Sequence, residues 1–373
     1  MTPRPVHILC PLGDPNSAKA WSGLPKRLVD ALQCCHRLGV AEQAQIHPFW
    51  YVLDKPFRLA LGEQSRNREQ TTLIHNRRVA ATLHRTHELQ DGHVLHIGTG
   101  AFPHKAALEG TRNYLLIDAT WRAWSNTGMG RQMPESIRLA VDRRERACYE
   151  KVRHVFTISQ YVRYQVCSDY GINPDKVTAI GSGFGSIQPF TGAKDYTWKK
   201  ILFVSKGHFV EKGGQLLVEA FRAAYSRDPQ LSLTIAGREE YLTQFKNEPG
   251  IIPMGYLQPG SDALQRLFNE HTLFVMPSQY EAWGFVYLEA LACKMPFIGL
   301  KHNAFRELSN NGQFGYGLET GSVHELTETL LSAFSDPAGL EARGKAGQAY
   351  CLGTYTWDKT IQRMLAVMDR PPA

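Results

Sequence analysis

The sequence predicts an α/β protein built from two doubly wound domains, each a parallel sheet covered by helices. Three observations support this fold class. The chain has 373 residues, more than one hydrophobic core usually contains. Short apolar runs alternate with amphipathic stretches of helical period. The alternation stops at a stretch rich in turn-forming residues, 181–194, and then resumes, which indicates a linker near residues 186–197.

In the first half of the chain, apolar runs predict strands, and the stretches between several of them predict helices. Leu24, Leu28, Leu32 and Leu38 recur at helical spacing, so a helix with one apolar face is expected at about residues 24–38. Further helices are expected at 136–153 and 160–170. Strands are expected at 7–12, 47–53, 93–97, 114–117, 155–158 and 177–180.

The second half repeats this alternation. Its expected strands are 201–204, 231–236, 273–276 and 297–300. Its expected helices are 213–226, 264–270, 285–293, 322–334, 340–351 and 356–369. The two halves are therefore predicted to form Rossmann-like domains at residues 1–188 and 189–355. Sheets of this kind bind ligands at the carboxyl ends of their strands, so the two domains are expected to face a central cleft.

The composition is that of an ordinary globular protein, with 43% apolar and 21% charged residues. The net charge of +7 favours anionic partners such as nucleotides or a phospholipid surface. No dense block of Lys and Arg with interleaved aromatic residues occurs, which argues against nucleic acid as a partner. Peripheral contact with the inner face of a membrane is compatible with the basic charge.

The seven cysteines form no CxxC pair and no Cys and His cluster at zinc spacing. This pattern fits a reducing cytosol and predicts neither a disulfide framework nor a zinc site. The N-terminal apolar run is interrupted by Pro11, which favours a strand over a signal peptide. No apolar run approaches the ~20 residues of a membrane span, so a cytoplasmic protein is expected.

The stretch at residues 277–296 follows an apolar strand and opens a helix. Gly284 stands where this helix begins, so backbone N–H groups there can face an anion. Glu281 precedes that start, and Glu289 lies about two turns into the helix, at about 3.6 residues per turn. Two ionised carboxylates, each able to accept two hydroxyl hydrogens, suit a ligand that carries diols.

This segment resembles the donor-site signature of family 4 glycosyltransferases, which are retaining enzymes of the GT-B fold. The matching residues are Pro277, Ser278, Glu281, Gly284, Glu289, Ala290 and Pro296. The resemblance implies that Glu281 lies at the hydroxyls of the donor sugar and that Glu289 binds the ribose hydroxyls. It assigns the backbone around Gly284, Phe285 and Val286 to the sugar and the diphosphate.

A second resemblance lies upstream, where residues 203–206 and 211–221 are similar to the family's FVGR element and its following KG element. It implies that Lys206 and Lys212 neutralise the leaving diphosphate, whose charge builds as the bond to the sugar breaks. Ser205 stands in place of the family's glycine. Lys206 stands in place of its arginine, so a point charge replaces a fork of N–H donors.

Three smaller matches complete the predicted donor site. Tyr256 and Leu257 resemble the family's loop near the base. Residues 355–357 are similar to its final aromatic segment, which implies that the closing helix, 356–373, packs back on the first domain. Gly23, in the loop after the first strand, resembles the glycine whose missing Cβ lets the backbone approach the donor phosphates.

The end of the strand at 114–117 supplies candidates for binding the acceptor. Asp118 and Trp121 follow this strand, as does Trp124, and an indole ring can stack on a sugar. Two GxG sequences, at 98–100 and 181–183, do not continue into the GxGxxG pattern of a dinucleotide site. The acceptor residues are therefore predicted from position alone.

These resemblances imply transfer of a sugar from a nucleotide-sugar donor to the hydroxyl of a carbohydrate, lipid-linked or other acceptor, with retention at the anomeric carbon. Glu281, Lys206 and Lys212 are the predicted catalytic residues. No DxD pair occurs in the sequence, so a metal-independent reaction without a cofactor is expected. Two alternatives stay open, namely a sugar-nucleotide epimerase of the same fold and a catalytically inactive sugar-nucleotide-binding protein.

Overall fold

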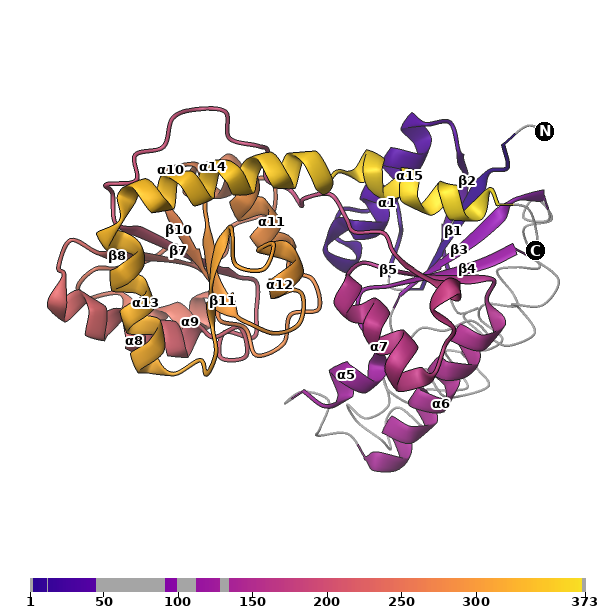
Figure 1. Cartoon of the computed structure of the whole chain (residues 1–373), viewed down its shortest axis with the longest axis horizontal. Coiled ribbons are helices and arrows are strands. Elements are labelled where there is room, and N and C mark those ends of the chain that lie inside the picture. Colours follow the sequence, from indigo (N-terminus) through magenta and orange to yellow (C-terminus); the bar gives the residue numbers. More distant parts are fainter. Residues whose placement is uncertain (1–2, 12, 45–90, 99–111, 128–133, 371–373) are drawn as a thin grey trace. The chain divides into compact units, whose positions relative to one another are not determined.

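The computed structural model describes residues 3–11, 13–44, 91–98, 112–127 and 134–370 (Figure 1). Contacts divide the chain into two compact units, Met1–Ser182 with Trp357–Ala373, and Gly183–Thr356. The first boundary lies before the predicted limit at residue 188. The reason is that Ser186, Ile187 and Gln188 donate their backbone N–H groups to side chains of the second unit.

The first unit contains a six-stranded parallel sheet in the order β2-β1-β3-β4-β5-β6. The strands β1 and β3 are buried along their whole length, as expected for continuous apolar runs covered on both faces. The strands are β1 (Val6–Cys10), β2 (Leu38–Gln43), β3 (His93–Ile97), β4 (Arg112–Ile117), β5 (His154–Thr157) and β6 (Val177–Ala179). The helices are α1 (Leu24–Cys34), α5 (Trp121–Ser125), α6 (Glu135–Lys151), α7 (Gln160–Tyr170) and α15 (Trp357–Met368), with short 3-10 turns at Ala20–Gly23 and Pro174–Lys176.

The helix predicted over residues 24–38 is shorter in the structure, and a strand follows it. Helix α1 ends at Cys34, and His36 adopts a positive φ of 54° that turns the chain. Leu38 then begins β2, which pairs in parallel with β1. The prediction was wrong here because hydrophobic spacing does not register a turn made by a single left-handed residue. The strand predicted at 47–53 lies outside the described residues.

The second unit contains another six-stranded parallel sheet, in the order β12-β11-β10-β7-β8-β9. Its strands are β7 (Lys200–Ser205), β8 (Ser232–Gly237), β9 (Ile251–Pro253), β10 (Leu273–Val275), β11 (Phe297–Leu300) and β12 (Gly315–Leu318). Its helices are α8 (Gly214–Arg227), α9 (Glu239–Leu242), α10 (Asp262–Glu270), α11 (Phe285–Ala292), α12 (Phe305–Leu308), α13 (Val323–Ser335) and α14 (Pro337–Thr354), with a 3-10 turn at Thr243–Phe245.

The strand order of the second sheet reverses between β7 and β10. From β7 the chain proceeds outward to β8 and β9, and from β10 it proceeds outward in the opposite direction to β11 and β12. Loops on either side of such a reversal diverge and leave room for a ligand at the carboxyl ends of the strands. Two helix-flanked parallel sheets confirm the predicted doubly wound architecture. The short elements β9, β12, α9 and α12 were not predicted, since three or four residues carry too little periodicity.

The last helix, α15, belongs to the first unit and packs against α1 (Figure 1). The two guanidinium Nη atoms of Arg37, just beyond α1, hold both carboxylate oxygens of Asp369 at 2.9 and 2.8 Å. Arg363 Nη1 donates to the carbonyl of Ile180 at 2.9 Å. These bonds fix the middle and the C-terminal end of the helix on the first unit's own residues.

Helix α13 begins with a serine cap, and the Glu325 side chain in its first turn fixes the turn before it. The Ser322 hydroxyl accepts the backbone N–H of Glu325 at 3.1 Å. The Glu325 carboxylate accepts the backbone N–H groups of Glu319, Thr320 and Gly321 at 2.6, 2.9 and 3.0 Å. Burial by itself would raise the pKa of Glu325, but these hydrogen bonds and the Thr320 hydroxyl lower it to about 2.

We expect Glu325→Ala to destabilise the second unit by about 1 kcal/mol, because three backbone donors lose their acceptor. Amide hydrogen exchange at residues 319–321, measured by mass spectrometry, should become faster. The wild-type carboxylate contributes stability above its ordinary pKa of 4.5 and loses it as the pH falls toward about 2. The control is Glu328→Ala on the same helix, which removes only an exposed ion pair to Arg227 and should leave these amides protected.

Candidate functional site

Two loops meet at the carboxyl ends of the adjacent strands β7 and β10. The loop after β7 leads into α8, and the loop after β10 leads into α11. The backbone N–H of Gln279 in the second loop donates to the carbonyl of Glu211 in the first at 2.9 Å. The predicted donor residues of the second half therefore gather at the point where the strand order reverses.

Two glycines allow these loops to approach each other and to start their helices. Gly213 precedes α8 with a φ of 81°, and a Cβ there would lie 2.4 Å from the carbonyl oxygen of Pro277. Gly284 precedes α11 with a φ of 88°, and a Cβ there would lie 2.6 Å from the ring of Tyr287. Neither helix has a side-chain cap among the described residues. The first-turn amides of both helices thus suit an anionic ligand.

The Lys212 ammonium and the Glu281 carboxylate form an ion pair across the two loops. The side chains are 29% and 20% exposed, so the pair is shielded but reachable from solvent. The lysine follows β7 and the glutamate follows β10, which means that sequence-distant residues are brought together by the pairing of these two strands. A cation and a carboxylate at the open starts of two helices can serve a phosphate and a hydroxyl group respectively.

Lys206 and Ser205 lie at the end of β7. The Lys206 side chain is exposed, and its backbone carbonyl accepts the Nε–H of Arg238 at 3.1 Å. Ser205 is buried at the last position of the strand, where it is paired with Gly237 of β8. The structure therefore places the Lys206 side chain in solvent on the loop that also carries Lys212.

Glu289 is buried, with only 6% of its surface exposed. Its Oε1 accepts the backbone N–H of Ser186 at 2.6 Å and that of Ile187 at 3.3 Å. Helix α11 is held in place by Tyr287, whose ring stacks on Phe297 at 4.5 Å and whose hydroxyl donates to the carbonyl of Met276. The two acidic residues of the signature consequently have different surroundings, one against a cation and one against backbone amides.

The remaining predicted donor residues of the second unit lie at the start of α11 and after β9. Phe285 and Val286 occupy the first turn of α11 and are half-buried. Tyr256 and Leu257 follow β9, and the Gly255 carbonyl before them accepts the N–H of Gly237 at 2.9 Å. Tyr256 is 39% exposed, so its ring is available to a ligand.

Gly23 lies in the first unit, at the carboxyl end of β1. It precedes α1 with a φ of 80°. Trp21 and Ser22 before it also have positive φ values, 39° and 57°, although neither is glycine. Side chains rarely adopt this conformation because Cβ then crowds the backbone, so this loop stores strain. The sequence did not predict the positive φ values of Trp21 and Ser22, because neither residue is a glycine.

The acceptor candidates follow β4. Asp118 is half-buried, whereas Trp121 is only 4% exposed. The Trp121 indole N–H donates to the Arg138 carbonyl at 3.2 Å, and the ring lies 5.0 Å from that of Trp124. The structure thus gives Trp121 a packing role between α5 and α6, in place of the exposed face expected for a sugar platform. Contact of Asp118 or Trp121 with an acceptor stays a prediction.

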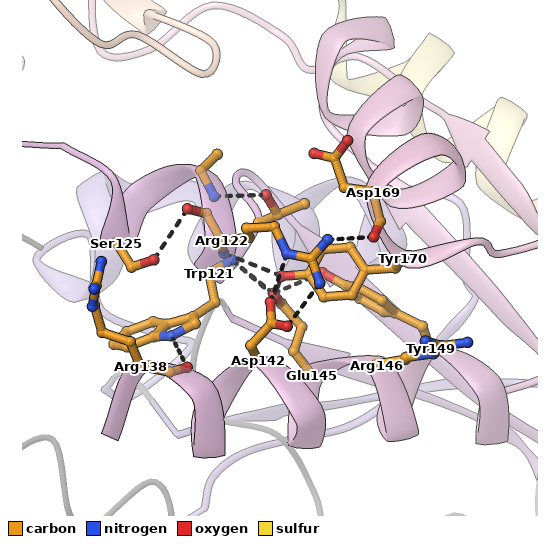
Figure 2. A network of polar contacts seen from close by, with 12 residues as sticks. Trp121, Arg122, Ser125, Arg138, Asp142, Glu145, Arg146, Tyr149, Asp169 and Tyr170 are labelled. Carbon is orange, nitrogen blue, oxygen red and sulfur yellow. Dashed lines mark hydrogen bonds and ion pairs between the residues drawn. The ribbon is translucent and has the colours of Figure 1, made fainter. Parts of the chain in front are cut away.

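A buried carboxylate that sequence reasoning missed holds α5 in place. Figure 2 shows Glu145 of α6 beneath the start of α5, with its two oxygens each 2.9 Å from the backbone N–H of Trp121. The Tyr149 hydroxyl donates to the same carboxylate at 2.7 Å, and the Tyr170 hydroxyl donates to it from α7. Glu145 stands in an arginine-rich run of the sequence, where it would ordinarily be taken for a surface charge.

Arg122 of α5 also contacts both α6 and α7, through groups other than the Glu145 carboxylate. Its Nε and Nη2 bond both oxygens of Asp142 at 2.9 and 2.7 Å, and its guanidinium lies 4.5 Å from the centre of the Tyr170 ring (Figure 2). Burial raises the pKa of Glu145 to about 7, although its hydrogen bonds to Tyr170, Trp121 and Tyr149 act in the opposite direction. The network links α5, α6 and α7 beside the carboxyl end of β4.

The described residues contain neither a metal-binding cluster nor a helix able to cross a membrane. No group of three or more His, Cys, Asp or Glu side chains in this part of the chain is arranged to hold a metal ion. Among the helices described, none has the length and apolar character needed to cross a membrane.

His96, at the end of β3, is buried and lies 2.7 Å from the Asn113 side chain, and burial lowers its pKa to about 4.

Comparison with known proteins shows a likeness to glycosyl transferases that is concentrated in the second unit. Residues 191–350 match the family described as glycosyl transferases group 1. A glycogen synthase of Mycobacterium tuberculosis is 24% identical over 212 residues, which are 54% of this chain and 50% of that protein. A GDP-mannose-dependent phosphatidylinositol monomannoside mannosyltransferase of Corynebacterium glutamicum is 25% identical over 237 residues, 58% of this chain and 61% of that one. The chain thus matches about half the length of the glycogen synthase.

Solved structures extend the likeness to the whole fold. Sucrose-phosphate synthase of Thermosynechococcus elongatus has a TM-score of 0.73 at 15% identity and covers 98% of both chains. HepE of Anabaena, solved with UDP and glucose, has a TM-score of 0.66 at 15% identity and covers 99% of this chain and 100% of its own. At this identity the likeness shows the fold, and it confirms the predicted GT-B architecture of two Rossmann-like domains.

We expect the contribution of Glu145 to the stability of the wild-type protein to fall as the pH rises from 4.5 to 7, against the opposite contribution of buried histidines such as His96. The pKa of Glu145 is about 7 in the folded protein against an ordinary value of 4.5, so the folded state keeps a proton that the unfolded state has lost. At about 1.4 kcal/mol for each pH unit, the contribution is on the order of 3 kcal/mol. Glu145→Gln, which is neutral at every pH, should remove this dependence.

Urea unfolding of both proteins between pH 4.5 and 8 measures the effect. The matched control is Glu150→Gln on the same helix, whose carboxylate is 53% exposed in an ion pair with Arg146 and should leave the pH profile unchanged. An unchanged slope in the Glu145 variant would show that this carboxylate ionises normally in the folded protein.

Proposed function

We propose that this chain is a glycosyltransferase that moves a sugar from a nucleotide-sugar donor to an acceptor hydroxyl, since residues 191–350 match the family described as glycosyl transferases group 1. One observation supports this proposal above the others. Lys212, Glu281 and the open starts of α8 and α11 meet at the reversal of strand order, where a sheet of this type binds its ligand.

In this proposal the donor's diphosphate binds at the starts of α8 and α11. Lys212 and Lys206 supply positive charge as the diphosphate leaves, and the helix amides add hydrogen bonds to its oxygens. Glu281 accepts hydroxyl groups of the sugar, and Glu289 accepts those of the ribose. The positive charge comes from side chains and helix ends, so the proposed reaction needs no metal ion.

The proposed reaction retains the configuration at the anomeric carbon. The bond between that carbon and the diphosphate oxygen breaks, and a bond to the acceptor oxygen forms on the same face of the sugar. The acceptor's proton passes to the leaving phosphate oxygen, which gains charge as the bond breaks. The ion pair with Glu281 keeps Lys212 in position beside this oxygen before the donor arrives.

The donor proposed here is a nucleoside diphosphate sugar, with the loop at Tyr256 and Leu257 at its base. One similar protein is named as GDP-mannose-dependent, and another was solved in complex with UDP and glucose. Guanine and uracil are therefore the bases to test first. Gly23 stays the donor-binding candidate of the first unit, and Asp118 and Trp121 stay its candidates for the acceptor side.

We expect one class of nucleoside diphosphate to raise the apparent melting temperature, because a ligand that binds only the folded state stabilises it. A thermal-shift panel of UDP-, GDP-, ADP- and dTDP-sugars measures this, with inorganic pyrophosphate as the control for phosphate binding alone. Stabilisation by pyrophosphate to the same extent as by every nucleotide would contradict a nucleotide-sugar site.

Turnover distinguishes the two alternative functions. An epimerase would release nucleoside diphosphate or an altered sugar without any acceptor, and a binding protein would show no turnover.

We expect Lys212→Ala and Glu281→Ala each to lower the rate of sugar transfer by about 100-fold or more, because a charge that stabilises the reacting groups is lost. Release of nucleoside diphosphate in the presence of acceptor measures this rate. Lys246→Ala, which removes an exposed lysine of the same unit, is the control and should retain full activity. Near-normal transfer by a folded Lys212 or Glu281 variant would rule out this assignment of the site.

A further inference from the structure

The backbone at residues 185–187 surrounds the carboxylate of Glu289. The N–H groups of Ser186 and Ile187 donate to Oε1 at 2.6 and 3.3 Å, and the Ser186 hydroxyl lies 3.4 Å from the same atom. Hydrogen bonds from backbone N–H groups to an ionised carboxylate are shorter and stronger than neutral ones. Three contacts on one oxygen restrict the rotation of the side chain in a buried position.

Gly185 makes this close approach possible. A Cβ at this position would lie 2.2 Å from Glu289 Oε1 and 2.9 Å from its Cδ. No side chain can occupy that space while the carboxylate keeps its place, so the approach depends on a glycine. The atoms in conflict are the end of a flexible side chain, which means that a larger residue would displace the carboxylate before it displaced the backbone.

The segment is anchored independently of Glu289. The N–H of Gln188 donates to the Gln265 side chain at 2.8 Å, and the Gln265 amide donates back to the Gln188 carbonyl at 3.1 Å. The N–H of Phe190 donates to the Ala292 carbonyl at 3.1 Å, and Gln348 donates to the Phe190 carbonyl at 2.9 Å. These bonds hold the strap, residues 185–190, on α10, α11 and α14. The strap is therefore a fixed reference against which the carboxylate is oriented.

We propose that Gly185 and Ser186 are positioning residues that orient the Glu289 carboxylate toward the ribose of the donor, and that they thereby make the site selective for ribonucleotides. This inference rests on the proposed function. Glu289 lies five residues beyond Gly284, about 7 Å along the helix at about 1.5 Å per residue. That separation allows one ligand to place its diphosphate at the start of α11 and its ribose beside Glu289.

Selectivity follows from the cost of an unmatched buried polar group. A site built to hydrogen-bond a hydroxyl rejects the analogue that lacks it, because the buried carboxylate then loses its partner. A carboxylate held in a fixed orientation by the strap discriminates strongly between a ribonucleotide and its 2′-deoxy analogue. A carboxylate that can rotate away adapts to either ligand. The ratio of affinities for a ribonucleotide and its 2′-deoxy analogue therefore reports the orientation of Glu289.

The test measures the dissociation constants of UDP and 2′-deoxy-UDP, and of GDP and 2′-deoxy-GDP, by isothermal titration calorimetry. We expect the wild-type protein to prefer the ribonucleotide by about tenfold or more with the base that it binds. Gly185→Ala should reduce that preference to about threefold or less, and Glu289→Gln should do the same. The matched control is Gly353→Ala, since a Cβ at Gly353 meets nothing within 4 Å, and it should keep the wild-type preference.

Each result separates this inference from the proposed function. If the wild-type protein prefers ribonucleotides and Gly185→Ala keeps the same ratio, the positioning role is wrong, even where both affinities fall together. If the wild-type protein binds both forms equally, Glu289 does not read the ribose and the inference is overturned while nucleotide binding stands. If the wild-type protein binds no nucleoside diphosphate at all, the proposed function itself fails.

Discussion

The contact between Gly213 and the Pro277 carbonyl is the constraint on which the candidate site depends. A Cβ at Gly213 would lie 2.4 Å from that oxygen, so only a glycine allows the loops after β7 and β10 to touch. The touching loops lead into α8 and α11, each of which starts from a left-handed glycine without a side-chain cap among the described residues. Their amides and the Lys212–Glu281 ion pair consequently share one small region.

The two acidic residues of the signature show how one helix supports two different tasks. Glu281 stands before the first turn of α11, partly exposed and neutralised by a lysine that a ligand can also engage. Glu289 is buried in the second turn of the helix and is held by backbone N–H groups of the strap. In the proposed site, a carboxylate that is fixed before the ligand arrives loses less freedom on binding.

The first unit uses a buried carboxylate in a comparable way. Glu145 accepts the first amide of α5 and two tyrosine hydroxyls, so a short helix of five residues is secured at the carboxyl end of β4 (Figure 2). Short helices have little stability of their own, since each leaves its first amides without partners. The buried anion supplies that partner, and Trp121 then packs against α6 in place of facing solvent.

The sequence by itself determined the doubly wound fold and the location of the donor loops. Alternating apolar runs predict parallel strands wherever the run is long enough, and the signature from Glu281 to Glu289 is local, so its spacing is visible in the chain. Only the tertiary structure decided which groups meet Lys212, Glu289 and Glu145. Their partners come from strands and helices far away in the chain, and the geometry of such contacts follows from sheet order and packing, which no local pattern encodes.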